Sequence, residues 1–235
     1  MSDIVNYEFK DGISVITMND GKANVMSVAM LTEINVALDQ AETNGGVLIL
    51  QGRDGIFSGG FDLGVFKSDD PNEIYSMLKS GAELTERLLS FPLPTIAACT
   101  GHGIAMGAFI LLSMDYRIGI EGDYRFAANE VAIGLTVPRF ATAVCRQRLT
   151  PAAFNYGLTT AHIFTTHAAL QAGFLDQLVS QETLQSTVAD TAGRFGQLDL
   201  ESHKATKLRL RADLLLTLRQ AIEEDCEIWQ SSYLK

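Results

Sequence analysis

Residues 95–120, TIAACTGHGIAMGAFILLSMDYRIGI, decide the fold. No Asp, Glu, Lys or Arg occurs from Thr95 to Met114. An unbroken apolar run of about 20 residues can span a bilayer, but residues 100–103 (TGHG) interrupt this one in its middle. A buried strand, a turn and a buried helix therefore explain it better than a membrane span. A second strand over residues 116–120 completes a strand–helix–strand unit, which is typical of a parallel sheet.

The same alternation extends along the chain on both sides. Asp11-Gly12 predicts a tight hairpin turn, and Ser27 is a good N-cap for a helix. Residues 47–50 form an apolar strand, and Pro92 and Pro94 end a helix before the next strand. We expect an α/β core followed by a mainly helical last third. The later predicted helices cover residues 72–90, 166–172, 183–195 and 203–229.

Charge and cysteine content exclude several classes of protein. The 235 residues include 28 Asp and Glu against 18 Lys and Arg, a net charge of −10. That balance argues against nucleic acid or an anionic membrane as partner, but it permits a small phosphorylated ligand held by local groups. Cys99, Cys145 and Cys226 are far apart and contain no C-x-x-C pair, so we expect neither a disulfide framework nor a metal site.

Two glycine-rich loops each follow an apolar strand, FSGGFDL at residues 57–63 and GHGIAMG at residues 101–107. The second is not a dinucleotide fingerprint, because Met106 stands where the third glycine is due. Neither a P-loop nor a G-x-S-x-G elbow occurs in the chain. Glycines let backbone N–H groups approach a ligand closely, and a pair of such groups can form an oxyanion hole. The pattern alone also allows two ordinary tight turns.

Several motifs together resemble the crotonase (enoyl-CoA hydratase/isomerase) superfamily. They are GKAN at residues 21–24, SGGFDL at 58–63, the segment 101–115, NEVAIG at 129–134 and AGFLD at 172–176. The resemblance implies an α/β fold with a crotonase-like ββα spiral core over residues 1–180. It also implies a helical C-terminal region over residues 181–235 that mediates a homotrimer or a dimer of trimers. The ligand would be an acyl-CoA thioester, and no cofactor is implied because CoA is part of the substrate.

The resemblance also assigns residues to the site. The backbone N–H groups of Phe61 and Met106 would bind the thioester oxygen as it becomes an enolate. Phe109 would line the acyl site, and a C-terminal cation, Lys207, would help to bind CoA. The other expected CoA contacts are Lys22, Ala23, Val25, Asp62, Leu63 and Gly64.

One departure from the family pattern bears on the chemistry. Enoyl-CoA hydratases carry two glutamates, and here the first position is Phe109 while the second is Glu130. Adding water needs both an acid and a base, whereas one carboxylate can move a double bond by taking a proton from C2 and returning it at C4. Apolar neighbours, expected to be Phe109, Phe126 and Ile133, would raise the pKa of Glu130.

The leading hypothesis is therefore an enoyl-CoA isomerase of fatty-acid metabolism. The alternatives are a weak enoyl-CoA hydratase or related lyase, and a non-catalytic acyl-CoA-binding relative. We expect a cytoplasmic protein, because the last residues, YLK, are not the peroxisomal Ser-Lys-Leu signal.

The remaining residues are expected to have structural roles. Asp62 and Asp115 lie at loop and helix ends, where capping and buried hydrogen bonds are the usual roles. Trp229 is expected in the core or a subunit contact, and residues 223–225 (EED) on a solvated face. The cations expected to gather near the nucleotide end of CoA are Lys22, Lys67, Lys207, Arg209 and Arg211.

Overall fold

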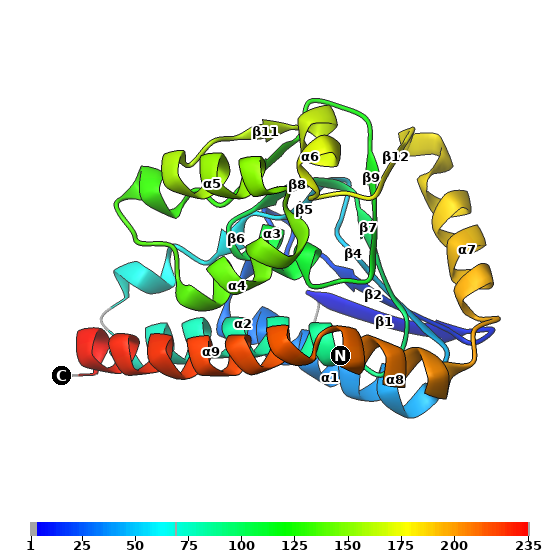
Figure 1. The fold of residues 1–235 in the computed structure, drawn as a ribbon, viewed down its shortest axis with the longest axis horizontal. Helices are drawn as coiled ribbons and strands as arrows, with labels where there is room; N and C mark the ends of the chain where they lie inside the picture. Colours follow the sequence, from blue (N-terminus) through cyan, green and yellow to red (C-terminus); the bar gives the residue numbers. More distant parts are fainter. Residues whose placement is uncertain (1–3, 69, 235) are drawn as a thin grey trace.

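The central layer of the protein is a six-stranded sheet (Figure 1). The structure is a computed structural model and describes residues 4–68 and 70–234. β1 and β2 form the predicted antiparallel hairpin around Asp11 and Gly12, whose φ angles are 51° and 77°. Every other neighbouring pair in this sheet is parallel, which confirms the predicted α/β core. In spatial order the strands are β1 (Val5–Lys10), β2 (Ile13–Met18), β4 (Val47–Gln51), β7 (Thr95–Cys99), β9 (Tyr116–Ile120) and β12 (Gln177–Val179).

A second sheet arises where we predicted only a turn. The first four residues of the 101–107 loop form β8, because glycine lets two backbones come very close: a Cβ on Gly101 would lie 2.0 Å from the Gly55 carbonyl carbon. The strands of this sheet in spatial order are β11 (Phe164–Thr165), β10 (Arg125–Ala127), β8 (Gly101–Ile104) and β5 (Gly55–Ser58). A separate parallel pair joins β3 (Val25–Met26) to β6 (Gly60–Phe61).

Helices cover both faces of the six-stranded sheet. Leu184, Val188 and Ala192 of α7 pack on one face, while the main core lies on the other (Figure 1). The helices of the core are α1 (Val28–Asn44), α2 (Pro71–Ser90), α3 (Met106–Leu112), α4 (Arg139–Arg148), α5 (Pro151–Thr160) and α6 (Thr166–Ala172). Short 3₁₀ helices are η1 (Val65–Lys67), η2 (Glu130–Ile133) and η3 (Gln181–Thr183).

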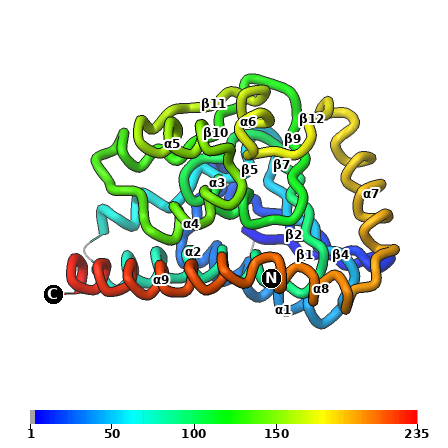
Figure 2. The backbone as a smooth tube through the Cα atoms, viewed as in Figure 1, coloured from blue at the N-terminus to red at the C-terminus, as the bar shows by residue number. Residues whose placement is uncertain are grey.

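The C-terminal region, from residue 181 to 234, contains helices joined by short turns and no strand among its described residues. The single helix predicted over residues 203–229 is in fact two, α8 (Leu200–Leu210) and α9 (Ala212–Tyr233), with α7 (Leu184–Phe195) before them. Arg211, at φ −102° and ψ 8°, separates them. α9 runs along α2 and α4 (Figure 2). No helix in the described part of the chain has both the length and the apolar character needed to cross a membrane.

α9 is tied to α4 by an acidic side chain that we expected in solvent. Asp225 is only 4% exposed, and its carboxylate accepts hydrogen bonds from the N–H groups of Arg139 (3.1 Å) and Phe140 (2.9 Å). Both N–H groups lie in the first turn of α4, where the helix itself provides no acceptor for them. Asp225 therefore caps α4 from a neighbouring helix. The prediction of a solvated face at residues 223–225 is therefore wrong for Asp225.

Candidate active site

The two glycine-rich loops meet in the structure. Gly60 has a φ of 99°, and a Cβ there would lie 2.9 Å from the Ala105 Cβ and 3.4 Å from the Met106 nitrogen. On the other side, a Cβ on Gly107 would lie 2.5 Å from the carbonyl oxygen of Ser58. Glycine at position 60 therefore keeps the space beside the Met106 N–H free of a side chain, and glycine at position 107 lets α3 lie directly against Ser58.

Met106 is the first residue of α3, so its N–H group has no carbonyl acceptor within the helix. Ala105, just before it, adopts φ 49° and ψ −121°, a backbone conformation that non-glycine residues rarely take. Its N–H donates to the Ala127 carbonyl at 2.8 Å, which fixes this turn against β10. The turn thus presents the start of α3 toward β6, the strand that contains Phe61.

A second segment lies against the first loop. The Asp20 carboxylate accepts hydrogen bonds from the N–H groups of Lys22 (2.7 Å), Asn24 (2.9 Å) and Val25 (3.0 Å). The Ala23 carbonyl accepts from the Gly59 N–H at 2.8 Å, and β3 pairs with β6. The structure therefore brings the expected CoA contacts at residues 22–25 beside those at residues 61–64.

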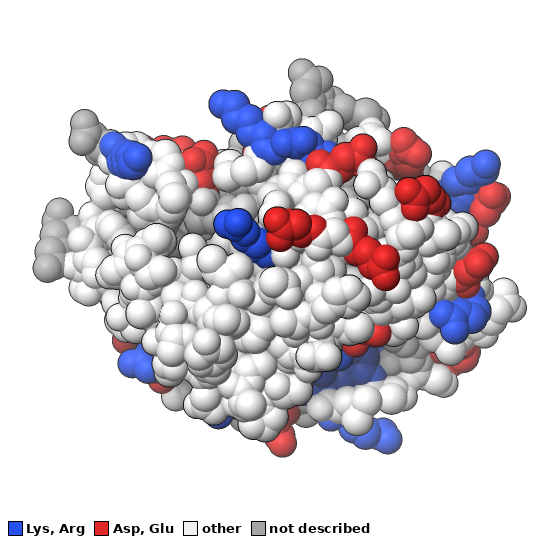
Figure 3. Space-filling view, turned by 90° about the horizontal axis from the view of Figure 1, so that it is seen from above, with Lys and Arg blue, Asp and Glu red and all other residues white. Residues whose placement is uncertain are grey.

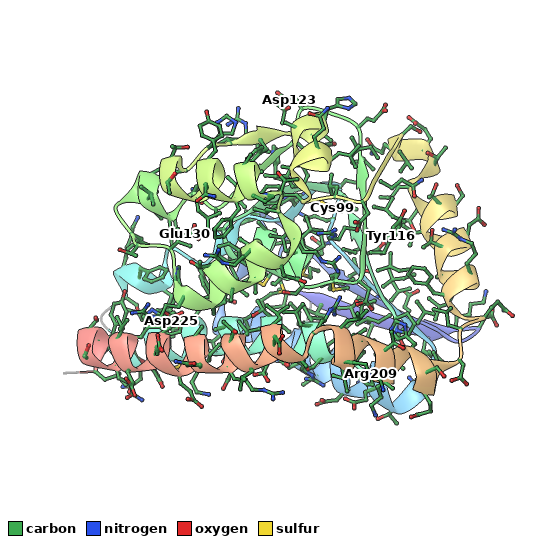
Figure 4. The ribbon with its side chains drawn as sticks, viewed as in Figure 1. Cys99, Tyr116, Asp123, Glu130, Arg209 and Asp225 are labelled. Atoms are coloured by element: carbon green, nitrogen blue, oxygen red, sulfur yellow. The ribbon has the colours of Figure 1, made fainter. Side chains whose placement is uncertain are left out.

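A cavity of about 160 Å³ lies next to these loops. Glu130 lies at the start of η2 and is labelled in Figure 4. It is the only carboxylate among the described lining residues. The walls are mostly apolar and come from both loops, η1, α2, α3, the segment 129–138 and α9. The lining residues are Gly59, Phe61, Leu63, Phe66, Leu78, Ala105, Phe109, Asn129, Glu130, Ile133, Leu135, Thr136, Pro138, Trp229 and Tyr233.

Glu130 has the environment of a reactive carboxyl group. It is 8% exposed, and its Oε2 atom has no hydrogen-bond partner within the described residues. Burial raises the pKa of Glu130 from 4.5 to about 7, against a smaller opposing effect of its own backbone N–H. Near neutral pH this carboxyl group therefore exchanges protons readily, as an acid–base residue must.

Phe109 lines the same cavity as Glu130 and is 1% exposed. Its ring packs edge-on against Phe140, with centroids 5.8 Å apart. Ile133 also lines the cavity, but Phe126 is not among the lining residues and packs near Phe174 instead. Of the three apolar neighbours expected for Glu130, Phe109 and Ile133 line its cavity and Phe126 does not.

Lys207 lies outside this cavity and is 5% exposed. Its ammonium group is 2.6 Å from an Asp115 carboxylate oxygen and donates to the carbonyls of Phe91 (2.9 Å) and Leu93 (2.7 Å). Arg211 pairs with the same carboxylate at 2.8 Å. Lys207 and Arg211 therefore both turn inward to the largely buried Asp115 carboxylate, which argues against the predicted part of either cation in binding CoA. Across the face shown in Figure 3, Lys and Arg side chains lie in several separate places.

Sequence reasoning missed the contribution of α9 to the cavity. Trp229 and Tyr233 both line it, although we expected Trp229 to have only a packing role. Trp229 does pack on Phe140, with centroids 6.2 Å apart, so it has both roles. The available signal was spacing: Asp225, Trp229 and Tyr233 are each four residues apart and so share one face of a helix.

The overall fold is that of crotonase-type enzymes. The structure superimposes on an enoyl-CoA hydratase from Mycobacterium ulcerans with a TM-score of 0.91 at 43% identity, over 96% of this chain and 98% of that chain. An enoyl-CoA isomerase from Mycobacterium tuberculosis gives a TM-score of 0.89 at 43% identity, over 95% and 97% of the two chains. By sequence, human mitochondrial enoyl-CoA delta isomerase 1 is 28% identical over 217 residues, which is 89% of this chain and 72% of the human one.

The chain belongs to the enoyl-CoA hydratase/isomerase family, whose pattern it matches over residues 8–234. The expectation of a crotonase-type enzyme of the acyl-CoA class is confirmed at this level. Similar proteins include both hydratases and isomerases, so the relatives support the family without selecting one reaction.

Proposed function

We propose that this protein moves the double bond of a 3-enoyl-CoA to give the trans-2-enoyl-CoA, with Glu130 as the single acid–base residue. The observation that carries the proposal is the cavity itself: one carboxylate, facing apolar walls that include Phe109. Among the described lining residues no second carboxylate accompanies Glu130, so the acid and base pair that hydration requires is incomplete.

In the proposed reaction the ionised Glu130 removes a proton from C2 of the substrate. The electron pair moves onto the thioester oxygen to give an enolate, which the N–H groups of Phe61 and Met106 stabilise. Each such donor is typically worth about 3 kcal/mol in the transition state. Protonated Glu130 then returns the proton at C4, and the double bond lies between C2 and C3. The apolar walls exclude water that would otherwise compete for the enolate.

The test is a direct comparison of two substrates. Purified protein is incubated with a trans-3-enoyl-CoA and with a trans-2-enoyl-CoA, and conjugation and hydration are followed by absorbance and product analysis. We expect conjugation to exceed hydration, and Glu130→Gln to lose activity by about 1,000-fold. Glu121→Gln, at an exposed glutamate, is the matched control. Hydration as fast as isomerisation would show that the proposed reaction is wrong.

A non-catalytic acyl-CoA-binding protein is the second candidate. Its distinguishing result would be binding of acyl-CoA esters without turnover of either substrate. The raised pKa of Glu130 favours an enzyme instead, because a binding protein gains nothing from a buried carboxyl group without a partner.

We also propose that the chain forms a homotrimer, or a dimer of trimers, through its C-terminal helices. Leu210 and Leu216, at the adjoining ends of α8 and α9, are 81% and 70% exposed, and exposed leucines of this kind mark contact surfaces when they occur together. Light scattering after size-exclusion chromatography tests this directly. Leu216→Glu should lower the measured mass toward that of one chain.

A cytoplasmic location is part of the same proposal. Cys99 and Cys145 are buried free thiols, and Cys226 is free as well. Free cysteines suit a reducing compartment. Imaging of a tagged full-length chain would test the location.

A further inference from the structure

The cavity beside Glu130 is too small for a long acyl chain. Its volume is about 160 Å³, whereas sites for drug-sized ligands usually span about 300–1,000 Å³. The reacting carbons and the thioester oxygen of a bound substrate would take up much of that space, so a longer tail would need a second space.

A larger groove lies between α4 and α9, with a volume of about 750 Å³. Its apolar part includes Val137, Ala143, Leu214, Ala221 and Ile228. Two of its charged lining residues, Arg139 and Glu224, form an ion pair at 3.0 Å and so neutralise each other. Arg146 and Asp213 also line the groove, so it is mixed in character, and its apolar residues are the part that can accept a hydrocarbon chain.

One wall separates the two spaces. Thr136, Pro138 and Trp229 line both the cavity and the groove, and Trp229 is the largest of the three side chains. The indole ring packs against Phe140, which in turn packs against Phe109 at the cavity wall.

The position of Trp229 is fixed by the structure around it. One helical turn earlier on α9, Asp225 binds the two N–H groups at the start of α4. α9 therefore cannot move away from α4 without breaking those hydrogen bonds. Trp229 itself is 8% exposed, so the wall is packed and not a loose surface side chain.

We propose that Trp229 determines the acyl-chain length that the site accepts, by closing the Glu130 cavity toward the groove between α4 and α9. The wild-type protein then takes short-chain acyl-CoA esters, and a smaller side chain at position 229 admits longer chains into the groove. This inference rests on the proposed acyl-CoA function, but it concerns the selection of the tail and not the proton transfer.

The experiment measures binding of saturated esters that cannot react, so that it is independent of turnover. Butyryl-CoA, octanoyl-CoA and dodecanoyl-CoA are titrated into the wild type and into Trp229→Ala by calorimetry. In the wild type we expect no gain in affinity with chain length. In Trp229→Ala we expect dodecanoyl-CoA to bind at least about tenfold more tightly than butyryl-CoA, since each buried methylene favours binding.

Two further variants test the position of the tail. Trp229→Phe keeps an aromatic wall and should keep the wild-type dependence on chain length. Thr217 lines the groove from the exposed side of α9, so adding Thr217→Trp to Trp229→Ala should fill the groove and abolish the gain. If Trp229→Ala does not fold, Trp229→Leu keeps more apolar volume and takes its place.

The outcomes separate this inference from the function on which it rests. Wild-type protein that binds no CoA ester would contradict the proposed function. Wild-type protein that binds dodecanoyl-CoA tenfold more tightly than butyryl-CoA would overturn the role of Trp229 without any variant. An unchanged chain-length dependence in folded Trp229→Ala, as expected if a second copy of the chain fills the groove, would overturn it as well.

Discussion

Glu130 and Asp115 are two largely buried carboxylates whose pKa values are shifted from their usual values in opposite directions. Burial raises the pKa of Glu130 to about 7. Burial also acts to raise the pKa of Asp115, but the neighbouring His203, Lys207 and Arg211 outweigh it and hold that pKa well below its usual value of 3.8. Desolvation is thus common to both sites, and the neighbouring groups decide the result.

The partners of each carboxylate show what that difference means. Asp115 accepts a hydrogen bond from the Thr95 N–H at 2.9 Å and pairs with Lys207 and Arg211, so it joins β7 to α8 and to the start of α9. Glu130 Oε2 has no partner among the described residues and lines the apolar cavity. A fully paired buried acid stabilises the fold, whereas an unpaired one is available for chemistry at a cost in stability.

The largest expected effect comes from removing the partnered acid. Asp115→Asn leaves Lys207 and Arg211 buried without their counter-charge, which typically costs about 4 kcal/mol. We expect a marked fall in the free energy of unfolding by urea at neutral pH. The loss should be the same from about pH 5 to pH 9, because Asp115 contributes its stability above its unfolded pKa and loses it only as the pH falls below that value.

Asp123→Asn, at an exposed aspartate, is the control and should change stability by less than about 0.5 kcal/mol. Equal stabilities of the Asp115 and Asp123 variants would show that the buried cluster contributes nothing.

The next largest effect is a gain in stability, expected when Glu130 is replaced. A group whose folded pKa is raised favours the folded state below its unfolded pKa, and that advantage is lost as the pH rises through the folded pKa. For Glu130 the range runs from 4.5 to about 7, which corresponds to about 3 kcal/mol. Glu130→Gln should therefore be more stable than the wild type near pH 8 and nearly equal to it near pH 4.

Urea unfolding of both proteins at the two pH values measures this difference. A variant less stable than the wild type at pH 8 would mean that Glu130 has a partner in the folded protein.

Local sequence rules predicted the strands and helix starts well where the determining interactions are short in range. Asp11-Gly12 gave the hairpin, and Ser27 caps α1 by accepting from the Met30 N–H at 3.2 Å. β8 was not predicted because its formation depends on contact with β5 and β10, which are distant in sequence. The break at Arg211 was also missed, since its side chain binds the Leu89 carbonyl and Asp115, the latter 96 positions away.

In the candidate site, too, residues within sequence motifs were predicted, whereas residues whose role depends on tertiary contacts were not. Glu130 and the loops of Phe61 and Met106 came from motifs, and the structure brings these segments together around one cavity. Lys207 was assigned to CoA from the family resemblance and its charge, but only the fold shows that Asp115 is its partner. Trp229 was missed as a wall because nothing in a single helix shows which neighbouring helix its ring will contact.

A smaller effect concerns the pH dependence of turnover. The base must be ionised to remove the C2 proton, so kcat/KM for isomerisation should fall about tenfold per pH unit below the pKa of Glu130, about 7. The measurement is an initial-rate profile from about pH 5 to pH 9 with a trans-3-enoyl-CoA. A profile that stays flat down to about pH 5 would show that Glu130 has an ordinary pKa or is not the base.

The smallest expected effect comes from making the Glu130 cavity more polar, and so more like the surroundings of Asp115. Phe109→Gln adds an amide that can donate to the carboxylate or admit water, both of which favour the ionised form. The midpoint of the pH–rate profile should therefore move down by about one unit, while Phe109→Leu, which keeps the wall apolar, should leave it near the wild-type value. Thermal unfolding verifies that both variants fold, because Phe109 also packs on Phe140. If both substitutions move the midpoint equally, the packing of Phe109 sets the acidity of Glu130, and the polarity of the wall does not.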